Sequence, residues 1–236
     1  VEGESKRQIW NLPARYGKTT VSSQWGPVWM LDRYPHLKVI LTSYGDKLAK
    51  ENAGTVRDLL DEHHDELRVA VRQDRRARGG WRTSEGGMVL AAGVGSTMTG
   101  YGGDVIVVDD PFKNWVEAHS ETTRESVWNW YRSVVRTRLQ TDDSAIIVVM
   151  TRWHEDDLVG RLLNPPDGEG EDWELVLLPA LAEPSQAEEQ APGFDLDEWC
   201  DVIGRKVGDV LEPERFSVDG VTDRHKALGP YLTAGM

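Results

Sequence analysis

Short apolar runs rich in β-branched residues recur along the first 180 residues and predict buried strands. Each run is only four or five residues long, which fits a strand better than a helix. The runs are Gln8–Leu12, Val39–Thr42, Val105–Val108, Ile146–Met150 and Leu175–Leu178. The intervals between successive runs are long enough to hold a helix.

Longer segments between these runs carry apolar residues at helical spacing. We expect helices over Thr19–Leu31, Asp46–Leu60, Thr122–Leu139 and Glu155–Leu163. Strands that alternate with helices predict an α/β fold, with a mainly parallel central sheet covered by helices on both faces. Two further runs, Trp81–Thr83 and Met88–Ala92, are joined by Glu85-Gly86-Gly87 and predict an inserted β-hairpin.

The composition is that of an ordinary soluble globular protein, with 236 residues and 39% hydrophobic side chains. The single cysteine, Cys200, excludes an internal disulfide framework. No stretch approaches the roughly 18 apolar residues of a membrane-spanning helix, so we expect a soluble protein with no membrane partner. From Glu183 to Asp201 the chain turns to Glu, Pro, Gln and Asp, which predicts a domain over residues 1–182 and an acidic linker or subdomain over 183–236.

The net charge of −13 is unevenly distributed along the chain. Residues 1–154 carry 21 basic and 20 acidic side chains, whereas residues 155–236 carry 6 basic and 20 acidic ones. The overall acidity therefore does not exclude a nucleic-acid partner for the first part. It does predict that this chain alone binds DNA weakly, because phosphate contacts need clustered basic side chains.

The segment from Ile9 to Thr20 reads as a strand, a turn and a Gly-Lys-Thr that begins a helix. Backbone N–H groups at such a helix start bind phosphate, Lys18 can reach the β- and γ-phosphates of ATP, and the Thr19 hydroxyl can bind Mg²⁺. Leu12 occupies the place of the usual first glycine, so an ordinary turn with a solvent-exposed lysine remains the alternative. The candidate nucleotide-binding residues are Pro13, Ala14, Arg15, Tyr16, Gly17, Lys18, Thr19 and Thr20. Arg15 is either a second cation at the γ-phosphate or a surface arginine.

Two acids follow the buried run Val105–Val108. Asp109 would bind Mg²⁺ directly or through water, and Asp110 would orient or deprotonate the attacking water. Most ATPases of this type have Glu in the second place, and Asp is shorter. The alternative is that both acids only cap the turn before Pro111.

The run Ile146–Met150 also delivers polar residues at its carboxyl end, where open α/β sheets bind ligands. We expect Thr151 to sense the γ-phosphate and Arg152 to contact either nucleotide or DNA. Asp156 and Asp157 fall in a first helical turn, where complementing the helix dipole is the simpler role.

Other aromatic and basic residues allow more than one interpretation. Core or interface packing is favoured over base stacking for Trp25, Trp29, Trp128 and Trp130. The run Arg72–Arg78 is equally consistent with phosphate contact and with a solvated loop. An arginine that acts on a neighbouring subunit could be Arg124, Arg132, Arg136 or Arg138, and the sequence does not select one.

Taken in order, these motifs resemble the large terminase subunit of tailed bacteriophages. The resemblance is carried by Asn11–Thr19, Val39–Gly45, Gly93–Gly100, Asp104–Pro111, Trp128–Ser133 and Met150–Leu158. In that family a Pro-x-Arg-x-Gly-Lys core commonly replaces the first glycine, which accounts for Leu12. The resemblance implies roles for Arg15, Lys18 and Thr19 at the nucleotide, Asp109 at Mg²⁺, Asp110 in catalysis and Thr151 in coupling.

The resemblance also implies a P-loop ATPase motor, with ATP and Mg²⁺ as cofactors, that drives double-stranded DNA through a portal protein into a procapsid. The implied partners include the small terminase subunit and further copies in a ring, with a monomer in isolation, all in the cytoplasm of the host cell. Tyr101 stands where relatives often carry a basic residue, and residues 228–236 resemble the junction to a nuclease domain. The alternatives are a nucleic-acid helicase or remodelling ATPase, and a nucleotide-binding scaffold of the portal complex that does not hydrolyse ATP.

Overall fold

An eight-stranded sheet forms the centre of the computed structural model, which describes residues 5–190 and 192–228. Its strands, in chain order, are β1 Arg7–Asn11, β2 Lys38–Ser43, β3 Val71–Ala77, β4 Gly80–Thr83, β5 Met88–Gly93, β6 Val105–Asp109, β7 Ala145–Met150 and β8 Glu174–Leu177. All five predicted buried strands are present, with ends that differ by at most one residue from the predicted ones. The expected junction at residues 228–236 lies almost wholly outside the described residues.

The helical segments lie mostly where the spacing of apolar residues predicts them. They are η1 Thr20–Trp25, α1 Gly26–Arg33, α2 Asp46–Glu62, α3 Trp115–His119, α4 Glu121–Trp130, η2 Tyr131–Val135, η3 Arg136–Arg138, α5 Leu158–Leu163, α6 Gln186–Glu189 and α7 Val218–Leu228. Two predicted helices are irregular: η1 is a π-helical stretch before α1, and α4 continues into a π-helical and then a 3₁₀ turn. Among the described residues no helix is both long and apolar enough to cross a membrane.

The strand order is β3-β4-β5-β2-β6-β7-β1-β8, and the six strands from β5 to β8 in this order run parallel. The predicted hairpin exists as the antiparallel pair β4 and β5, and β5 also joins the main sheet beside β2. The run Arg72–Arg78 forms most of strand β3 at the sheet edge rather than a loop. Parallel strands end at one edge, so the segments after β1, β2, β6 and β7 meet there.

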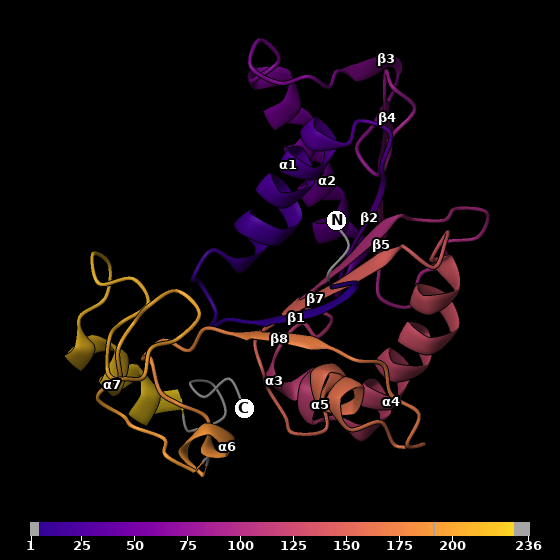
Figure 1. Cartoon of the computed structure of the whole chain (residues 1–236). Coiled ribbons are helices and arrows are strands. Elements are labelled where there is room, and N and C mark those ends of the chain that lie inside the picture. Colours follow the sequence, from indigo (N-terminus) through magenta and orange to yellow (C-terminus); the bar gives the residue numbers. More distant parts are fainter. Residues whose placement is uncertain (1–4, 191, 229–236) are drawn as a thin grey trace.

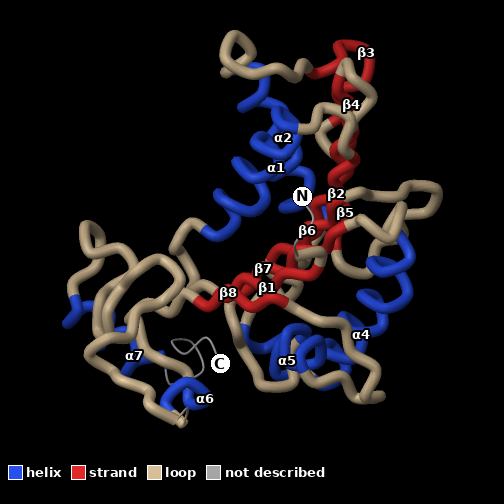
Figure 2. The backbone as a smooth tube through the Cα atoms, viewed as in Figure 1, coloured by secondary structure: helices blue, strands red, loops and turns tan. Residues whose placement is uncertain are grey.

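Helices cover both faces of the sheet, as Figures 1 and 2 show. On one face α1 and α2 pack on alternate residues of the central strands, including Val39, Leu41, Val105 and Val107. On the other face α3, α4 and α5 pack on the intervening residues, such as Ile40, Ile106 and Val108. Core or interface packing is the prediction for four tryptophans, and Trp128 and Trp130 do lie in the core. Trp25 and Trp29 have exposed side chains and are not core residues, so for them interface packing stays a prediction.

The segment after β8 turns away from the sheet and lies beside the carboxyl end of β1 (Figure 1). Its small apolar cluster combines Ala180, Val210 and Val221 with Tyr16 from the loop after β1. An isolated antiparallel β-bridge between Leu181 and Val210 holds two parts of this segment together. This acidic segment is thus packed onto residues near the start of the chain as well as onto itself.

Candidate functional site

The loop from Leu12 to Thr19 connects β1 to η1 and has the backbone of a phosphate-binding turn. Arg15 and Gly17 both lie in the left-handed region, with φ of 71° and 74°. A glycine adopts this conformation without strain, whereas Arg15 needs support from its surroundings. Turns of this kind, before a helix start, direct successive N–H groups toward an anion.

Lys18 is largely buried in this loop, and its Nζ lies 2.9 Å from Oδ2 of Asp110. Asp110 itself has a left-handed backbone, with φ of 44°. Its N–H donates to the carbonyl of Val149, its carbonyl accepts from the N–H of Tyr44, and its Oδ1 accepts from the N–H of Thr151. The ends of β2 and β7 therefore hold Asp110 in a strained conformation beside the loop lysine.

Asp109 is almost completely buried, at 1% exposure, on the side of the sheet covered by η1. Its carboxylate accepts hydrogen bonds from Oγ1 of Thr19 at 3.3 Å and from Oγ of Ser23 at 2.9 Å. Burial and the nearby charge of Asp110 raise the pKa of Asp109 to about 6, against the smaller opposing effects of Ser23, Thr19 and Lys18. A buried carboxylate in this situation gains from a bound cation.

Thr151 links the loop to the carboxylate pair. Its hydroxyl donates to the carbonyl of Leu12 at 3.2 Å, and its N–H donates to Asp110 at 3.1 Å. Thr151 thus lies beside Asp110, which is paired with Lys18 and directly follows Asp109. Its role in sensing the γ-phosphate remains a prediction.

Arg152 is paired within its own chain, and its contact with nucleotide or DNA stays a prediction. Its side chain is 6% exposed, and Nε lies 3.0 Å from Oδ2 of the fully buried Asp157. The predicted first-turn position of Asp156 and Asp157 is wrong, because α5 begins only at Leu158: Asp157 is its N-cap and accepts from the N–H of Gly160. Asp156 lies before the cap and forms ion pairs with Arg124 of α4 and Arg161 of α5. Arg124 is thereby buried and unsuited to act on a neighbouring subunit.

The remaining loop residues fall into two groups. Ala14, Arg15, Gly17 and Thr20 are exposed and Pro13 is half-buried, so this part of the loop faces solvent. Tyr16 instead turns inward, and its ring lies 5.0 Å from that of Phe216, between centroids. Its side chain therefore serves packing, whereas its backbone stays part of the loop. The carbonyl of Arg15 accepts a hydrogen bond from Arg215.

Ser23 and Ser43 also lie at the site, although neither is among the residues predicted for it. Ser23 follows Thr19 by four residues, and that spacing places two hydroxyls on one side of a helix, which was a usable signal. Ser43 directly follows the predicted strand Val39–Thr42 and gives no chemical signal of its own. Only the pairing of β2 with β6 brings it beside Asp109.

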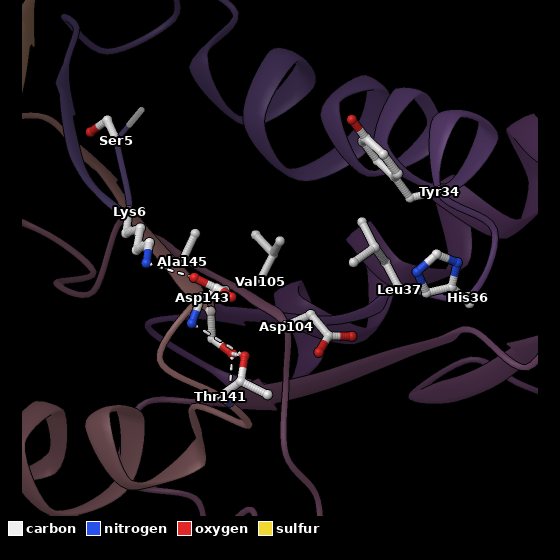
Figure 3. A pocket seen from close by; sticks show the side chains of 11 residues that line it. Ser5, Lys6, Tyr34, His36, Leu37, Asp104, Val105, Thr141, Asp143 and Ala145 are labelled. Carbon is white, nitrogen blue, oxygen red and sulfur yellow. Dashed lines mark hydrogen bonds and ion pairs between the residues drawn. The ribbon is translucent and has the colours of Figure 1, made fainter. Parts of the chain in front are cut away.

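A separate cavity of about 470 Å³ lies at the opposite edge of the sheet, at the amino ends of the strands (Figure 3). Lys6, His36, Asp104 and Asp143 are among its lining residues, and Lys6 forms an ion pair with Asp143. None of the predicted site residues lines this cavity. The candidate nucleotide site is therefore the carboxyl edge, where the loop after β1 meets the ends of β6 and β7.

Solved structures of a phage enzyme domain share this fold. The Thermus phage P74-26 large terminase ATPase domain is similar with a TM-score of 0.54 and 13% identity, over 76% of this chain and 78% of that chain. An arginine-to-alanine mutant of that domain gives a TM-score of 0.52 at 13% identity, over 75% and 77% of the two chains. At this identity the likeness concerns the fold. A search of curated proteins finds no match.

The family model described as terminase large subunit, T4likevirus-type, N-terminal, matches residues 9–202. The matched range begins in β1 and includes the loop with Lys18, the Asp109–Asp110 pair, and Thr151. It thus contains every group that the structure gathers at the carboxyl edge. The chain therefore belongs to the family of large terminase subunits of phages, as a member of its N-terminal domain.

Proposed function

We propose that this chain is the Mg²⁺-dependent ATPase motor domain of a DNA-packaging terminase. The observation that carries the proposal is the convergence of Lys18, Thr19, Asp109 and Asp110 at one edge of the sheet. Two contacts join the loop to the acids: an ion pair between Lys18 and Asp110, and a hydrogen bond that Thr19 donates to Asp109. This combination of a loop lysine, a hydroxyl and two acids serves phosphoryl transfer in P-loop enzymes.

The donor set fits Mg²⁺. Asp109 offers a buried carboxylate and Thr19 a hydroxyl, and Mg²⁺ prefers such hard oxygen ligands together with water and substrate phosphates. Bound at Asp109 and Thr19, the ion would supply charge stabilisation at the β- and γ-phosphates. No described group of three or more His, Cys, Asp or Glu side chains offers an alternative metal site.

Side chains of the chain itself would bind the phosphates, activate the water and couple hydrolysis to movement. Lys18 would bind the phosphate oxygens on which charge develops, with Arg15 as a second cation. Asp110 would accept a hydrogen bond from the attacking water and take its proton. Thr151 contacts both the loop and Asp110, so it would transmit a change at the γ-phosphate to β7 and the segment that follows it.

Phosphate release from ATP in the presence of Mg²⁺ tests the enzymatic part of this proposal. We expect slow release by the 236-residue chain, since neighbouring subunits would complete the site, and background release after Lys18→Ala or Asp109→Ala. Lys6→Ala is the matched control, because it removes a lysine that pairs with an aspartate at the other edge of the sheet. Unchanged release by the Lys18 and Asp109 variants would refute the proposed site.

The motor part of the proposal comprises translocation of double-stranded DNA, a portal and procapsid, the small terminase subunit, a ring of copies and the host cytoplasm. Its basis is the family membership, and a downstream nuclease domain in the full-length protein belongs to the same proposal. We expect double-stranded DNA and portal to stimulate ATP turnover without separating the strands of a forked duplex. Strand separation would favour a helicase, and tight ATP binding without turnover under these conditions would favour a scaffold.

A further inference from the structure

Ser43 is the last residue of β2, and its hydroxyl is fully buried with no hydrogen-bond partner among the described residues. Buried hydroxyls are nearly always paired, since losing contact with water without compensation is unfavourable. Thr42, the preceding residue, follows the rule: its hydroxyl donates to the carbonyl of Val107 at 3.1 Å. The unpaired state of Ser43 therefore needs an explanation that does not apply to Thr42.

The neighbours of Ser43 in the sheet indicate that explanation. In the parallel register Ser43 pairs with Asp109 on β6 and with Gly93 on β5. Side chains alternate along a strand, so Ser43 faces the same side as Val39 and Leu41, the side covered by α1 and α2. Asp109 faces that side too, because Thr19 and Ser23 reach its carboxylate from η1.

Gly93 leaves no competing side chain on the other flank. A Cβ at Gly93 would come within 2.5 Å of the backbone nitrogen of Asp46, at the start of α2. This close approach of α2 allows only glycine there, and the Asp46 carboxylate on that flank already accepts hydrogen bonds from the N–H of Gly93 and the hydroxyl of Ser96. The side chain that strand pairing places beside Ser43 is that of Asp109.

The hydroxyls of Thr19 and Ser23 bond directly to the buried carboxylate of Asp109. Ser43, which pairs with Asp109 in the sheet, has a third hydroxyl that bonds to no described residue. Mg²⁺ keeps several of its waters when it binds a protein, and those waters need hydrogen-bond acceptors. We propose that Ser43 is a positioning residue for Mg²⁺ at Asp109, its hydroxyl oxygen accepting a hydrogen bond from a water bound to the ion. The inference rests on the proposed function, because it assumes that Mg²⁺ binds with the nucleotide.

The test measures binding of the slowly hydrolysed analogue ATP-γ-S to the 236-residue chain by calorimetry, with Mg²⁺ and with the ion removed by a chelator. We expect Ser43→Ala to weaken binding in Mg²⁺ about tenfold, a usual effect of removing an outer hydrogen bond at a metal site. Binding without Mg²⁺ should be unchanged. The melting temperature of Ser43→Ala should equal or exceed that of the wild type, since the variant loses an unpaired buried hydroxyl.

Two further variants make the result specific. Ser43→Cys keeps the size of the side chain but is a weak acceptor, and we expect a loss in the same direction. Thr42→Val removes the neighbouring hydroxyl from the opposite face, and it should leave the effect of Mg²⁺ on ATP-γ-S binding intact. A similar loss in Thr42→Val, or an equal loss with and without Mg²⁺ in Ser43→Ala, would overturn the inference in favour of a purely structural role.

The failure of the inference and that of the proposed function give different results. If the wild-type chain binds ATP-γ-S more tightly in Mg²⁺ and Ser43→Ala behaves identically, the role of Ser43 is refuted and the ATPase proposal stands. If Mg²⁺ does not strengthen binding by the wild-type chain, the metal site itself is refuted, and the role of Ser43 with it.

Discussion

Nζ of Lys18 lies 2.9 Å from Oδ2 of Asp110, so the lysine of the phosphate loop and the second acid of the carboxylate pair form one ion pair. Lys18 is largely buried in this arrangement, whereas Asp110 is about a quarter exposed. A nucleotide whose phosphates bind Lys18 therefore has to share the lysine with Asp110 or displace the carboxylate. The ion pair couples the entry of a phosphate to the position of the group that would activate water.

Asp110→Asn tests this coupling. The variant removes a negative charge beside the proposed position of the γ-phosphate and leaves Lys18 without a competing carboxylate. We expect ATP-γ-S to bind as tightly as in the wild type or more tightly, while ATP turnover falls by about 10²–10⁴-fold through loss of the general base. Calorimetry and phosphate release measure the two effects separately. Asp143→Asn at the other edge should change neither, and weaker binding by Asp110→Asn would contradict the competition between the carboxylate and phosphate.

Asp109 makes the stability of the chain depend on pH. Its folded-state pKa is about 6, compared with 3.8 for an unperturbed carboxyl, so the folded protein holds a proton that the unfolded chain has released between these values. Stability from this group is present below pH 4 and is lost as the pH rises through 6. The difference corresponds to a cost on the order of 3 kcal/mol at neutral pH.

Asp109→Asn should remove that cost. We expect the variant to be more stable than the wild type at pH 8 and to differ little at pH 4, when urea unfolding is measured without Mg²⁺. Asp143→Asn provides a control of opposite sign, because Lys6 lowers the pKa of Asp143. A constant difference between Asp109→Asn and the wild type across this pH range would contradict the assigned cause.

The central sheet could be predicted because its buried parallel strands are short segments with consecutive apolar residues. Strand β3 could not, since an exposed edge strand such as Val71–Ala77 carries polar residues on both faces and shows no alternation. In this strand Arg72 forms an ion pair with Asp74, and Arg76 forms one with Asp61. These contacts agree with the predicted solvated segment, although the residues lie in a strand and not in a loop.

The core of the candidate site could also be predicted, since Lys18, Thr19, Asp109 and Asp110 lie at the junctions of strands with the segments after them. Three features required the structure, because they depend on contacts between residues distant in sequence. Arg152 turns to the buried Asp157, Ser43 gains its neighbour through strand pairing, and Tyr16 packs on a ring 200 residues later.

The pair Tyr16 and Phe216 should stabilise both the phosphate loop and the acidic segment that packs on it. The rings belong to one apolar cluster, and Arg215 adds a hydrogen bond to the carbonyl of Arg15. We expect Tyr16→Leu and Phe216→Leu each to destabilise the chain, with a coupling of about 1 kcal/mol in a double-mutant cycle from urea unfolding. Trp29→Leu, which alters an exposed ring, should cause little change. Additive effects of the two Leu substitutions would show that the rings do not stabilise each other.

We expect a larger loss of stability at the buried pair of Arg152 and Asp157, because removing one partner leaves the other buried charge uncompensated. Asp157 accepts from Nε of Arg152 and from the N–H of Gly160, so one substitution removes both the ion pair and the cap of α5. We expect Asp157→Ala to lower the free energy of unfolding by about 3–5 kcal/mol. Asp172→Ala, at an exposed position, should lower it by less than about 0.5 kcal/mol.

The pairing of opposite charges predicts how the defect of Asp157→Ala can be relieved. Adding Arg152→Met removes the buried guanidinium that has lost its carboxylate partner, so the double variant should recover part of the stability that Asp157→Ala loses. Urea unfolding of the four proteins of the cycle measures this recovery directly. If Arg152→Met instead lowers stability further in the Asp157→Ala background, the side chain of Arg152 contributes through contacts other than this ion pair, such as its hydrogen bonds to the carbonyls of His154 and Glu155.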